Sequence, residues 1–293
     1  MLNNVKSKKI LSLILEPLKK RKKLNLLKYN KLLLKRLNIN HKDFEGLQLL
    51  KKWNKKFNLK MKDIEDIKPF NVREKNLRNK IFEDLNTIGF NQLKELNLSE
   101  YKISSIVLLE KAKFKDLENL DLDANEISDI SILAKVNFKK LKVLDLAFNE
   151  ISDIRVLANV NFIKLEYLGL SHNKIEEINV LEKVDFKELK ELYLQFNKIS
   201  DINVLEKVKF DKLEILWLNS NNISDINILV KTNLNELKKL DLSCNSIWDI
   251  RPLEKVKFEN LEELNLKRNP LGKDELFLII INNLTTKISY LNY

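Results

Sequence analysis

The stretch of sequence that decides the fold is Leu117–Lys140, which reads LENLDLDANEISDISILAKVNFKK. The chain repeats this stretch at a constant 24-residue step, without an insertion. The first leucine of the unit recurs at these positions: Leu93, Leu117, Leu141, Leu165, Leu189, Leu213, Leu237 and Leu261. A fixed period of this length predicts a chain built from stacked turns of similar structure.

The first half of each unit predicts a strand followed by a turn. Leu120 and Leu122 alternate with polar neighbours, which is typical of a short strand with one buried face. Asn125 comes next, and its amide can hydrogen-bond backbone groups left open at a bend. This asparagine recurs at Asn125, Asn149, Asn173, Asn197, Asn221, Asn245 and Asn269. We expect these side chains to form a ladder along the stack.

The second half of each unit predicts the return path. Ser128 and Asp129 suit the N-cap of a short helix that carries Leu133 and Val136. An aromatic column follows, interrupted only by Leu234: Phe90, Phe114, Phe138, Phe162, Phe186, Phe210 and Phe258. A single turn cannot bury its own apolar side, so stacking is needed to create a core.

The L-x-x-L-x-L-x-x-N core within this period resembles the leucine-rich repeat. The Asn-x-Ile-Ser-Asp-Ile segments are similar to the repeats of the protein phosphatase 1 regulatory subunit and of bacterial internalins, over residues 85–293. Those relatives commonly use a shorter unit, and the extra length here falls in the V-x-F segment. The resemblance implies an α/β fold, a curved solenoid with parallel strands on its concave face. It also implies that this face binds protein.

Charge and pattern divide the chain into three predicted parts. Residues 1–62 form a basic α-helical region, with helices at 5–18, at 24–37 and within 43–57. Residues 63–92 form a connector and N-terminal cap, and residues 93–293 form the solenoid. Residues 1–92 hold 24 Lys and Arg against 9 Asp and Glu, whereas the rest holds 29 against 33. The basic charge therefore belongs to the N-terminal third.

The two ends of the repeat array differ from its middle. Tyr101 replaces the ladder asparagine in the first turn, as expected of a terminal repeat. At the other end, Lys273–Asn283 predicts a longer helix. Ile288 and Tyr290 fall one full repeat step after Leu264 and Leu266. They predict a ninth strand that closes the core as a C-terminal cap.

Cysteine usage and the start of the chain favour a cytoplasmic location, with the nucleus as the alternative. Cys244 is the only cysteine, and a lone thiol suits a reducing compartment. The first apolar run ends at Glu16-Pro17, has no small-residue cleavage site and is too short to span a bilayer.

The candidate binding site consists of residues that we expect to project from the strands and the bends just after them. Six aromatic residues and one isoleucine cluster there. We call them the aromatic patch: Phe148, Tyr167, His172, Tyr193, Phe196, Ile215 and Trp217. Asp121, Asp123 and Asp145 border it on the N-terminal side. Exposed aromatic side chains with a charged rim are typical of protein interfaces. The alternative is that these aromatic residues only suit strands and cover one another.

The motifs favour a non-catalytic protein-interaction scaffold. The chain has two histidines, no His/Cys cluster at metal-ligand spacing and no Gly-rich phosphate loop, so we expect no catalytic residue, metal or cofactor. We expect a protein partner, basic in charge, and not nucleic acid, a membrane or a small-molecule substrate.

Two alternative roles remain open at this point, besides nucleic-acid binding through residues 1–80, which the basic charge supports without a recognised nucleic-acid motif. The helices at 5–37 followed by repeats resemble an F-box domain joined to leucine-rich repeats, which implies a substrate adaptor of a ubiquitin ligase. That family's Leu-Pro opening is missing, because Pro17 comes only at the end of the first helix. The other alternative, a phosphatase regulatory subunit, follows from the repeat resemblance.

Overall fold

The structure is a computed structural model that describes residues 94–293 except residues 101, 112–113 and 257–258. All of the described residues belong to one compact unit. The predictions for residues 1–92, which comprise the basic helical region and the connector, lie outside the described residues, as do those for Tyr101 and Phe258.

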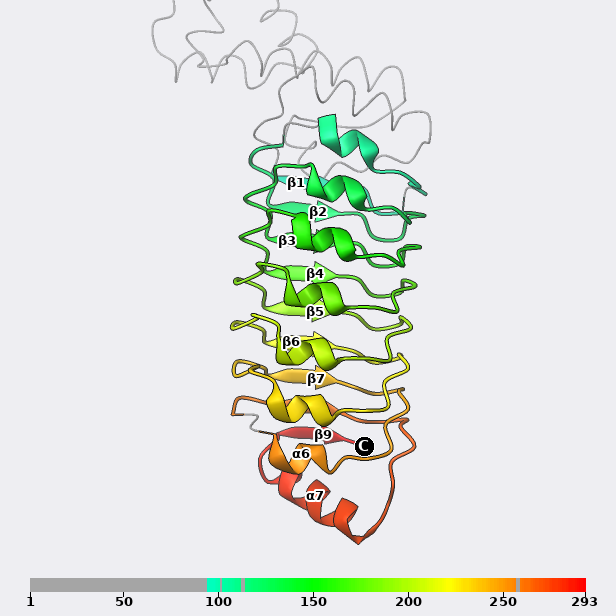
Figure 1. Ribbon diagram of the computed structural model, residues 1–293, viewed down its shortest axis with the longest axis vertical. Helices are drawn as coiled ribbons and strands as arrows, with labels where there is room; N and C mark the ends of the chain where they lie inside the picture. Colours follow the sequence, from blue (N-terminus) through cyan, green and yellow to red (C-terminus); the bar gives the residue numbers. More distant parts are fainter. Residues whose placement is uncertain (1–93, 101, 112–113, 257–258) are drawn as a thin grey trace, which may run out of the picture. The chain divides into compact units, whose positions relative to one another are not determined.

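The described chain forms one sheet in which each strand is parallel to its neighbours and the spatial order follows the sequence (Figure 1). The strands are β1 (Glu95–Asn97), β2 (Asn119–Asp121), β3 (Val143–Asp145), β4 (Tyr167–Gly169), β5 (Glu191–Tyr193), β6 (Ile215–Trp217), β7 (Lys239–Asp241), β8 (Glu263–Asn265) and β9 (Tyr290–Asn292). From β1 to β8 the register advances by one repeat step a strand, so that Leu96 lies opposite Leu120 and Leu240 opposite Leu264. The predicted frame is therefore confirmed, and the chain forms a curved solenoid.

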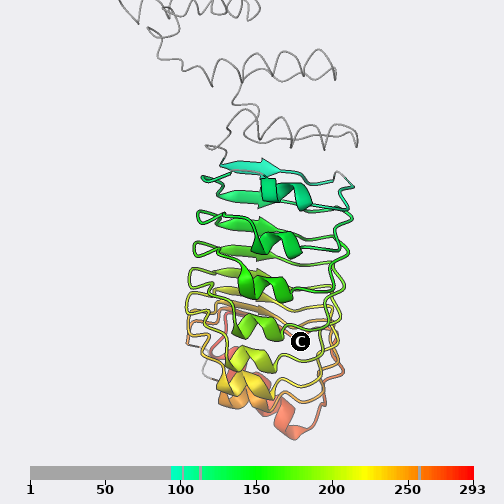
Figure 2. The same cartoon turned by 45° about the horizontal axis from the view of Figure 1, so that its top comes forward.

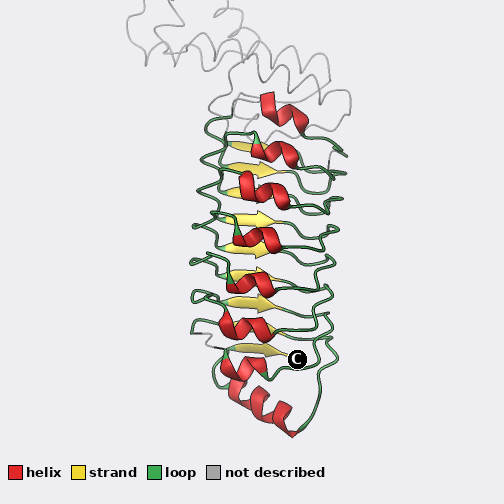
Figure 3. Cartoon of the chain, in the orientation of Figure 1, coloured by secondary structure: helices red, strands yellow, loops and turns green. Residues whose placement is uncertain are grey.

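Short helices return the chain between strands and lie on the side of the solenoid opposite the sheet (Figures 2 and 3). The 3-10 helices are η3 (Val107–Lys111), η4 (Ser131–Ala134), η5 (Arg155–Asn159), η6 (Asn179–Glu182), η7 (Asn203–Glu206) and η8 (Asn227–Lys231). The α-helices are α6 (Pro252–Lys255) and α7 (Glu275–Thr285). We call the outer surface of the sheet, together with the bend residues that follow each strand, the strand face.

The core lies between the strands and the return segments. The leucines of β1–β8 are buried, as are these phenylalanines of the return column: Phe114, Phe138, Phe162, Phe186 and Phe210. The rings of Phe138 and Phe162 stack with their centroids 6.4 Å apart and 13° between their planes. Because buried residues of one turn pack against those of the next, as Phe138 does against Phe114 and Phe162, the core depends on contacts between turns.

The predicted asparagine ladder is present. The Nδ2 atom of Asn149 donates to the carbonyl oxygens of Leu122 at 2.9 Å, Leu146 at 3.1 Å and Ala147 at 2.9 Å. Its Oδ1 atom accepts from the backbone N–H of Ile127 at 2.9 Å. Each asparagine thus joins its own turn to the preceding one, which satisfies backbone groups that water cannot reach.

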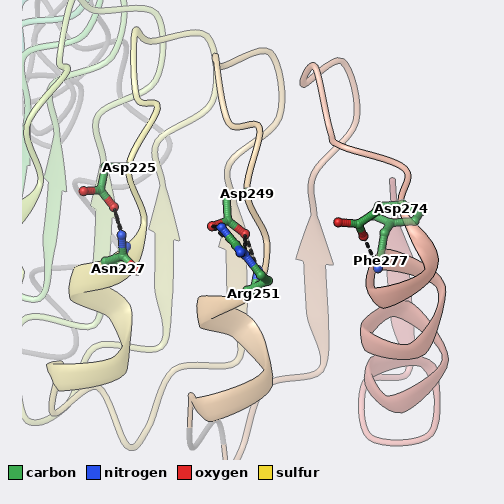
Figure 4. A network of polar contacts seen from close by, with 6 residues as sticks. All are labelled: Asp225, Asn227, Asp249, Arg251, Asp274 and Phe277. Atoms are coloured by element: carbon green, nitrogen blue, oxygen red, sulfur yellow. Dashed lines mark hydrogen bonds and ion pairs between the residues drawn. The ribbon is translucent and has the colours of Figure 1, made fainter.

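At five bends of the described solenoid an aspartate bonds to the start of a helix, but from a different position than predicted. The Oδ1 atom of Asp225 accepts from the backbone N–H of Asn227 at 2.8 Å, and Asp249 accepts in the same way from Arg251 at 2.9 Å (Figure 4). The residue at the N-cap of η8 is an isoleucine, Ile226. Asp225 therefore lies one residue before the cap of its helix, whereas Asp249 lies two residues before the cap of α6, which is Arg251. Each aspartate still satisfies a backbone donor at the start of its helix.

A column of alternating charge accompanies the ladder. Its members are Lys94, Glu118, Lys142, Glu166, Lys190, Glu214, Lys238 and Glu262. Glu118 pairs with Lys94 at 2.9 Å and with Lys142 at 2.8 Å, and its hydrogen bonds to these two residues lower its pKa to about 2. Each exposed pair of this kind adds little stability. Opposite charges lie next to each other when neighbouring turns pair in the observed register, so the column is consistent with that register.

The C-terminal cap confirms the ninth strand and corrects its frame. The helix begins at Glu275, two residues later than predicted, because Asp274 accepts from the backbone N–H of Phe277 at 2.8 Å and caps it (Figure 4). In β9, Leu291 and not Ile288 lies opposite Leu264. The last step is therefore three residues longer than the others, since the longer helix lengthens this turn.

Candidate protein-binding surface

Three aromatic side chains on β4, β5 and β6 form the first part of the aromatic patch, which we call the strand row: Tyr167, Tyr193 and Trp217. The ring centroids of Tyr167 and Tyr193 are 5.1 Å apart, and those of Tyr193 and Trp217 are 5.0 Å apart in an edge-to-face arrangement. Such contacts between neighbouring strands stabilise an aromatic pair beyond its simple area burial. Each ring therefore helps to fix the orientation of the next.

Gly169 makes room for this row, a role that sequence reasoning did not assign to it. In the sheet register Gly169, not Tyr167, lies opposite Tyr193, so the Tyr167 ring crosses from one column to the next. A Cβ atom on Gly169 would lie 2.6 Å from Oδ1 of Asp145 and 3.1 Å from Cε1 of Tyr167. A glycine among outward-facing aromatic residues was the only available sequence signal.

Hydrogen bonds hold the two tyrosines. The hydroxyl of Tyr167 donates to Oδ2 of Asp145 at 3.3 Å, and that of Tyr193 donates to Oε2 of Glu191 at 2.7 Å. Burial raises the pKa of both phenols above their usual range, and the neighbouring carboxylates raise it further. Both hydroxyls therefore stay protonated and remain donors to the carboxylates.

The second part of the aromatic patch, which we call the bend stack, consists of Phe148, His172 and Phe196. The centroids of Phe148 and His172 are 3.8 Å apart with planes 12° apart, and those of His172 and Phe196 are 4.0 Å apart with planes 13° apart. Burial between the two phenyl rings lowers the pKa of His172, so the imidazole is neutral near pH 7. The stack is therefore an uncharged, continuous aromatic surface.

The backbone at the bend stack is left-handed. Phe148, His172 and Phe196 have φ values of 48°, 51° and 55°. Non-glycine residues seldom adopt this conformation, and it persists where surrounding contacts impose it. Here the N–H of each residue donates to the next turn, for example from Phe148 to the carbonyl oxygen of Ser171 at 2.9 Å. The repeat backbone thus aims all three rings in the same direction.

The aromatic side chains remain accessible. Phe148 is 52% exposed, Phe196 46% and Trp217 37%. Ile215 is half-buried on β6, and no ring contact links it to the rest of the patch. The structure thus gathers the aromatic members into two ordered groups on β4–β6 and the adjoining bends.

The predicted acidic border is present, and its members also have a structural role. The Oδ1 atom of Asp121 accepts from the N–H of Asp123, and that of Asp145 accepts from the N–H of Ala147, both at 3.0 Å. Each aspartate therefore closes the turn that follows its strand. In addition, Nδ2 of Asn97 donates to Oδ2 of Asp121 at 2.5 Å.

Asp123 carries the strongest electrostatic cost in this border. Its pKa is raised to about 6, first by burial and then by the negative charges of Asp145 and Asp121. Burial likewise raises the pKa of Asp121. In the described part of the chain, none of these three carboxylates forms an ion pair. The border therefore presents negative charge that the described solenoid does not neutralise.

Other exposed apolar side chains lie outside the aromatic patch, among them Tyr290 on β9. Trp248 is 60% exposed, and a Cβ atom on Gly272 would lie 3.0 Å from its ring. Leu278 and Ile279 of α7 are also exposed, and sequence reasoning did not single them out.

Among the described residues, no group of three His, Cys, Asp or Glu side chains is arranged to hold a metal ion. Across the same residues, we find no helix with the length and apolar character needed to cross a membrane.

Comparison with known families agrees with this geometry. The family described as "Leucine rich repeat" matches residues 115–175 and 139–199, and the family described as "Leucine Rich repeats (2 copies)" matches residues 187–235. No curated protein sequence matches the chain. The chain therefore contains leucine-rich repeats over residues 115–235.

Solved structures narrow the type of repeat. An internalin (inlF) from Listeria monocytogenes is similar with 27% identity and a TM-score of 0.59, over 76% of this chain and 58% of the internalin. Internalin C2 from the same organism is similar with 24% identity and a TM-score of 0.57, over 71% of this chain and 83% of that one. The repeats are therefore similar to the internalin type.

A more distant structure shares the fold alone. The leucine-rich-repeat ectodomain of a membrane receptor kinase from Arabidopsis thaliana has 21% identity and a TM-score of 0.52. The match covers 71% of this chain and 28% of the receptor chain.

Proposed function

We propose that this protein is a non-catalytic scaffold that binds a protein partner through the aromatic patch on its strand face. The observation that carries the proposal is that exposed rings are held in fixed orientations by one another and by the repeat backbone. Phe148 and Phe196 are about half exposed while they stack on His172. An ordered aromatic surface loses little conformational entropy when it becomes buried in a complex.

The size of the aromatic patch suits the centre of an interface. Strands lie ~4.8 Å apart, so β3 to β6 span ~14 Å. A stable complex buries about 800 Å² on each partner, and the aromatic centre of such an interface is surrounded by polar residues. The charged positions of the strand face on both sides of the aromatic patch would supply that rim.

The charge of the strand face favours a basic partner. Asp121, Asp123 and Asp145 contribute negative charge beside the aromatic rings, and burial has already removed part of the hydration of Asp121 and Asp123. Charges at the rim of an interface mainly increase the rate of association and select the partner. The same charges repel the phosphate backbone of nucleic acid.

A solved structure with the same fold contains a bound partner. The Arabidopsis receptor kinase ectodomain was solved in complex with Casparian strip integrity factor 2, so that protein carries a bound partner on the same fold. The adaptor and phosphatase-subunit alternatives remain predictions. The adaptor role depends on residues 1–62, which lie outside the described residues.

Affinity capture with the full-length chain tests the proposal. The parent and a Trp217→Ala, Tyr193→Ala double variant serve as bait, and Trp248→Ala is the matched control because this exposed tryptophan lies outside the strand face. We expect one protein to be captured by the parent and the control and to be lost with the double variant. Hydrogen exchange of the purified complex should then show protection in β4–β6.

Two results would overturn the proposal. One is equal capture by the double variant and the parent, and the other is protection confined to segments away from the strand face. The identity of the captured protein also decides between the alternatives, since ligase subunits would favour the adaptor and a phosphatase catalytic subunit the regulatory role.

A further inference from the structure

The bend stack ends at Ala124. The corresponding residues of successive turns share a left-handed backbone: Glu100, Ala124, Phe148, His172, Phe196, Ser220, Cys244 and Arg268. The three rings are nearly parallel, so one face of Phe148 covers His172 and the other points towards the turn that carries Ala124. A methyl group cannot cover a phenyl ring, and Phe148 is the most exposed ring of the bend stack.

Negative charge flanks this open end. Asp123 immediately precedes Ala124, and Glu100 occupies the equivalent position one turn earlier. The Oδ1 atom of Asp123 is buried and has no hydrogen-bond partner in the described chain. The charge of Glu100 also contributes to the raised pKa of Asp123. In the described residues, neither carboxylate forms an ion pair.

The opposite end of the bend stack has a different character. Ser220 follows Phe196 in the same column and is also small, with a φ of 55°. The residue before Ser220 is Asn219, and the next residue of the column is Cys244, so neither carries a carboxylate. The two ends therefore offer similar space, but negative charge accompanies only the end at Ala124.

We propose that the end of the bend stack at Ala124 binds an arginine side chain of the protein partner. The guanidinium lies flat on the open face of Phe148, above Ala124, and donates hydrogen bonds to the carboxylates of Asp123 and Glu100. This assignment rests on the proposed function and specifies the chemistry of one contact within it.

The geometry favours arginine over lysine. A guanidinium is planar, stacks on aromatic faces and donates from its edge, so it can satisfy Phe148 and the carboxylates together. Two turns separate Phe148 from Glu100, a distance of about 10 Å. The rings of the bend stack are 3.8–4.0 Å apart, so one planar group at this spacing fits in the intervening turn. A lysine ammonium is compact and more strongly hydrated, and it cannot stack in this way.

Titration with N-acetyl-arginine amide tests the inference without a protein partner. The full-length chain is labelled with carbon-13 in its phenylalanine rings, and the Phe148 signal is assigned with a Phe148→Leu variant. We expect a saturable shift of the Phe148 signal with the arginine amide. N-acetyl-lysine amide should bind ~2–5-fold more weakly, which is the factor expected from a cation–π contact at an exposed site.

Two matched variants locate the site. Ala124→Phe extends the bend stack over the proposed site, and Ser220→Phe extends it at the other end. Phe148 and Phe196 already adopt the same left-handed backbone in this column, so both substitutions are compatible with the turn. We expect Ala124→Phe to abolish the arginine response and Ser220→Phe to retain it. A Glu100→Gln, Asp123→Asn double variant should weaken the response without occupying the space.

Three outcomes would overturn the inference: no saturable shift in the parent, equal binding of the two amides, or an arginine response that survives Ala124→Phe. Each leaves the proposed function standing, because that proposal depends on capture through Trp217 and Tyr193. Conversely, if the Trp217→Ala, Tyr193→Ala double variant captured the partner as well as the parent does, the proposed function would fail, but the result of the amide titration would not change.

Discussion

Replacement of one ladder asparagine should destabilise the solenoid by an amount that the hydrogen bonds define. Nδ2 of Asn221 donates to the carbonyl oxygens of Leu194 and Leu218, each at 3.0 Å, and its Oδ1 accepts from the N–H of Ile199 at 2.9 Å. In Asn221→Leu, a side chain of similar size removes these three bonds and a longer one, at 3.4 Å, from Nδ2 to the carbonyl oxygen of Asn219, which keeps the N–H of Phe196 as a donor. The consequence depends on which backbone groups then lack a partner.

The ladder is redundant for carbonyl groups and not for N–H groups. The carbonyl oxygen of Leu194 also accepts from Asn197 at 3.0 Å, and that of Leu218 also accepts from Asn245 at 3.0 Å. Both carbonyls therefore keep a donor in Asn221→Leu. Only the buried N–H of Ile199 loses its acceptor, which costs about 1–3 kcal/mol. A loss of ~2 kcal/mol lowers the melting temperature of a domain of this size by about 4–8 °C.

Thermal and chemical unfolding of the full-length chain measure this effect, with Asn222→Leu as the control. Asn222 is the next residue, its side chain is exposed, and it forms no side-chain hydrogen bond within the described structure. A leucine there should change stability by no more than ~0.5 kcal/mol. Equal stability of the Asn221 and Asn222 variants would refute the ladder's contribution, and a loss well above ~3 kcal/mol would refute its redundancy.

Three further predictions concern the strand face. Gly169→Ala should destabilise by ~1–3 kcal/mol in thermal unfolding and displace Asp145, because its Cβ atom would lie 2.6 Å from Oδ1; unchanged stability would contradict this crowding. Asp123→Asn should stabilise the protein at pH 7 and reduce the rise in its free energy of unfolding on acidification. In the parent, the folded pKa of about 6 lies above the ordinary 3.8, so protonation of Asp123 stabilises the folded state as pH falls through 6 towards 3.8. Unfolding of both proteins at pH 7 and pH 5 measures this difference, and parallel pH profiles would exclude it. Asp121→Asn and Asp145→Asn should slow association with the captured partner at low salt and lose this effect at high salt, while Asn keeps the turn bond as Asn97 does. An effect independent of salt would show that these charges do not steer association.

The sequence was sufficient to predict the strands and the ladder because every turn uses the same side chains for the same backbone groups. Asn149 and Asn221 make equivalent bonds although three turns separate them. A pattern that is physically required at each step can be recognised from its period. The outward position of Trp217 followed from the same period, since residues between two buried leucines face away from the core.

The arrangement within the aromatic patch could not be predicted from the period. Tyr167 contacts Tyr193 from a different column, because Gly169 leaves the space and Asp145 accepts from the Tyr167 hydroxyl. The bend stack depends on a left-handed backbone at Phe148, which the residue type itself does not favour. Such contacts depend on side-chain rotamers and on neighbouring turns, neither of which a repeat pattern specifies.

The frame of the last strand was wrong for a related reason. A strictly constant step placed Ile288 opposite Leu264, whereas Leu291 takes that position. The repeat period applies only where consecutive turns have the same length. The terminal turn contains α7, whose length is set by its own cap and apolar face and not by a neighbouring turn.

The dissociation constant of the captured partner tests the central claim most directly. It should be measured by calorimetry for the parent, Trp217→Ala and Trp248→Ala, with melting temperatures as a control for folding. We expect Trp217→Ala to bind more than tenfold more weakly, a loss of ~1.4 kcal/mol or more, and Trp248→Ala to bind as the parent does. Equal affinity of the parent and Trp217→Ala would contradict binding through the aromatic patch.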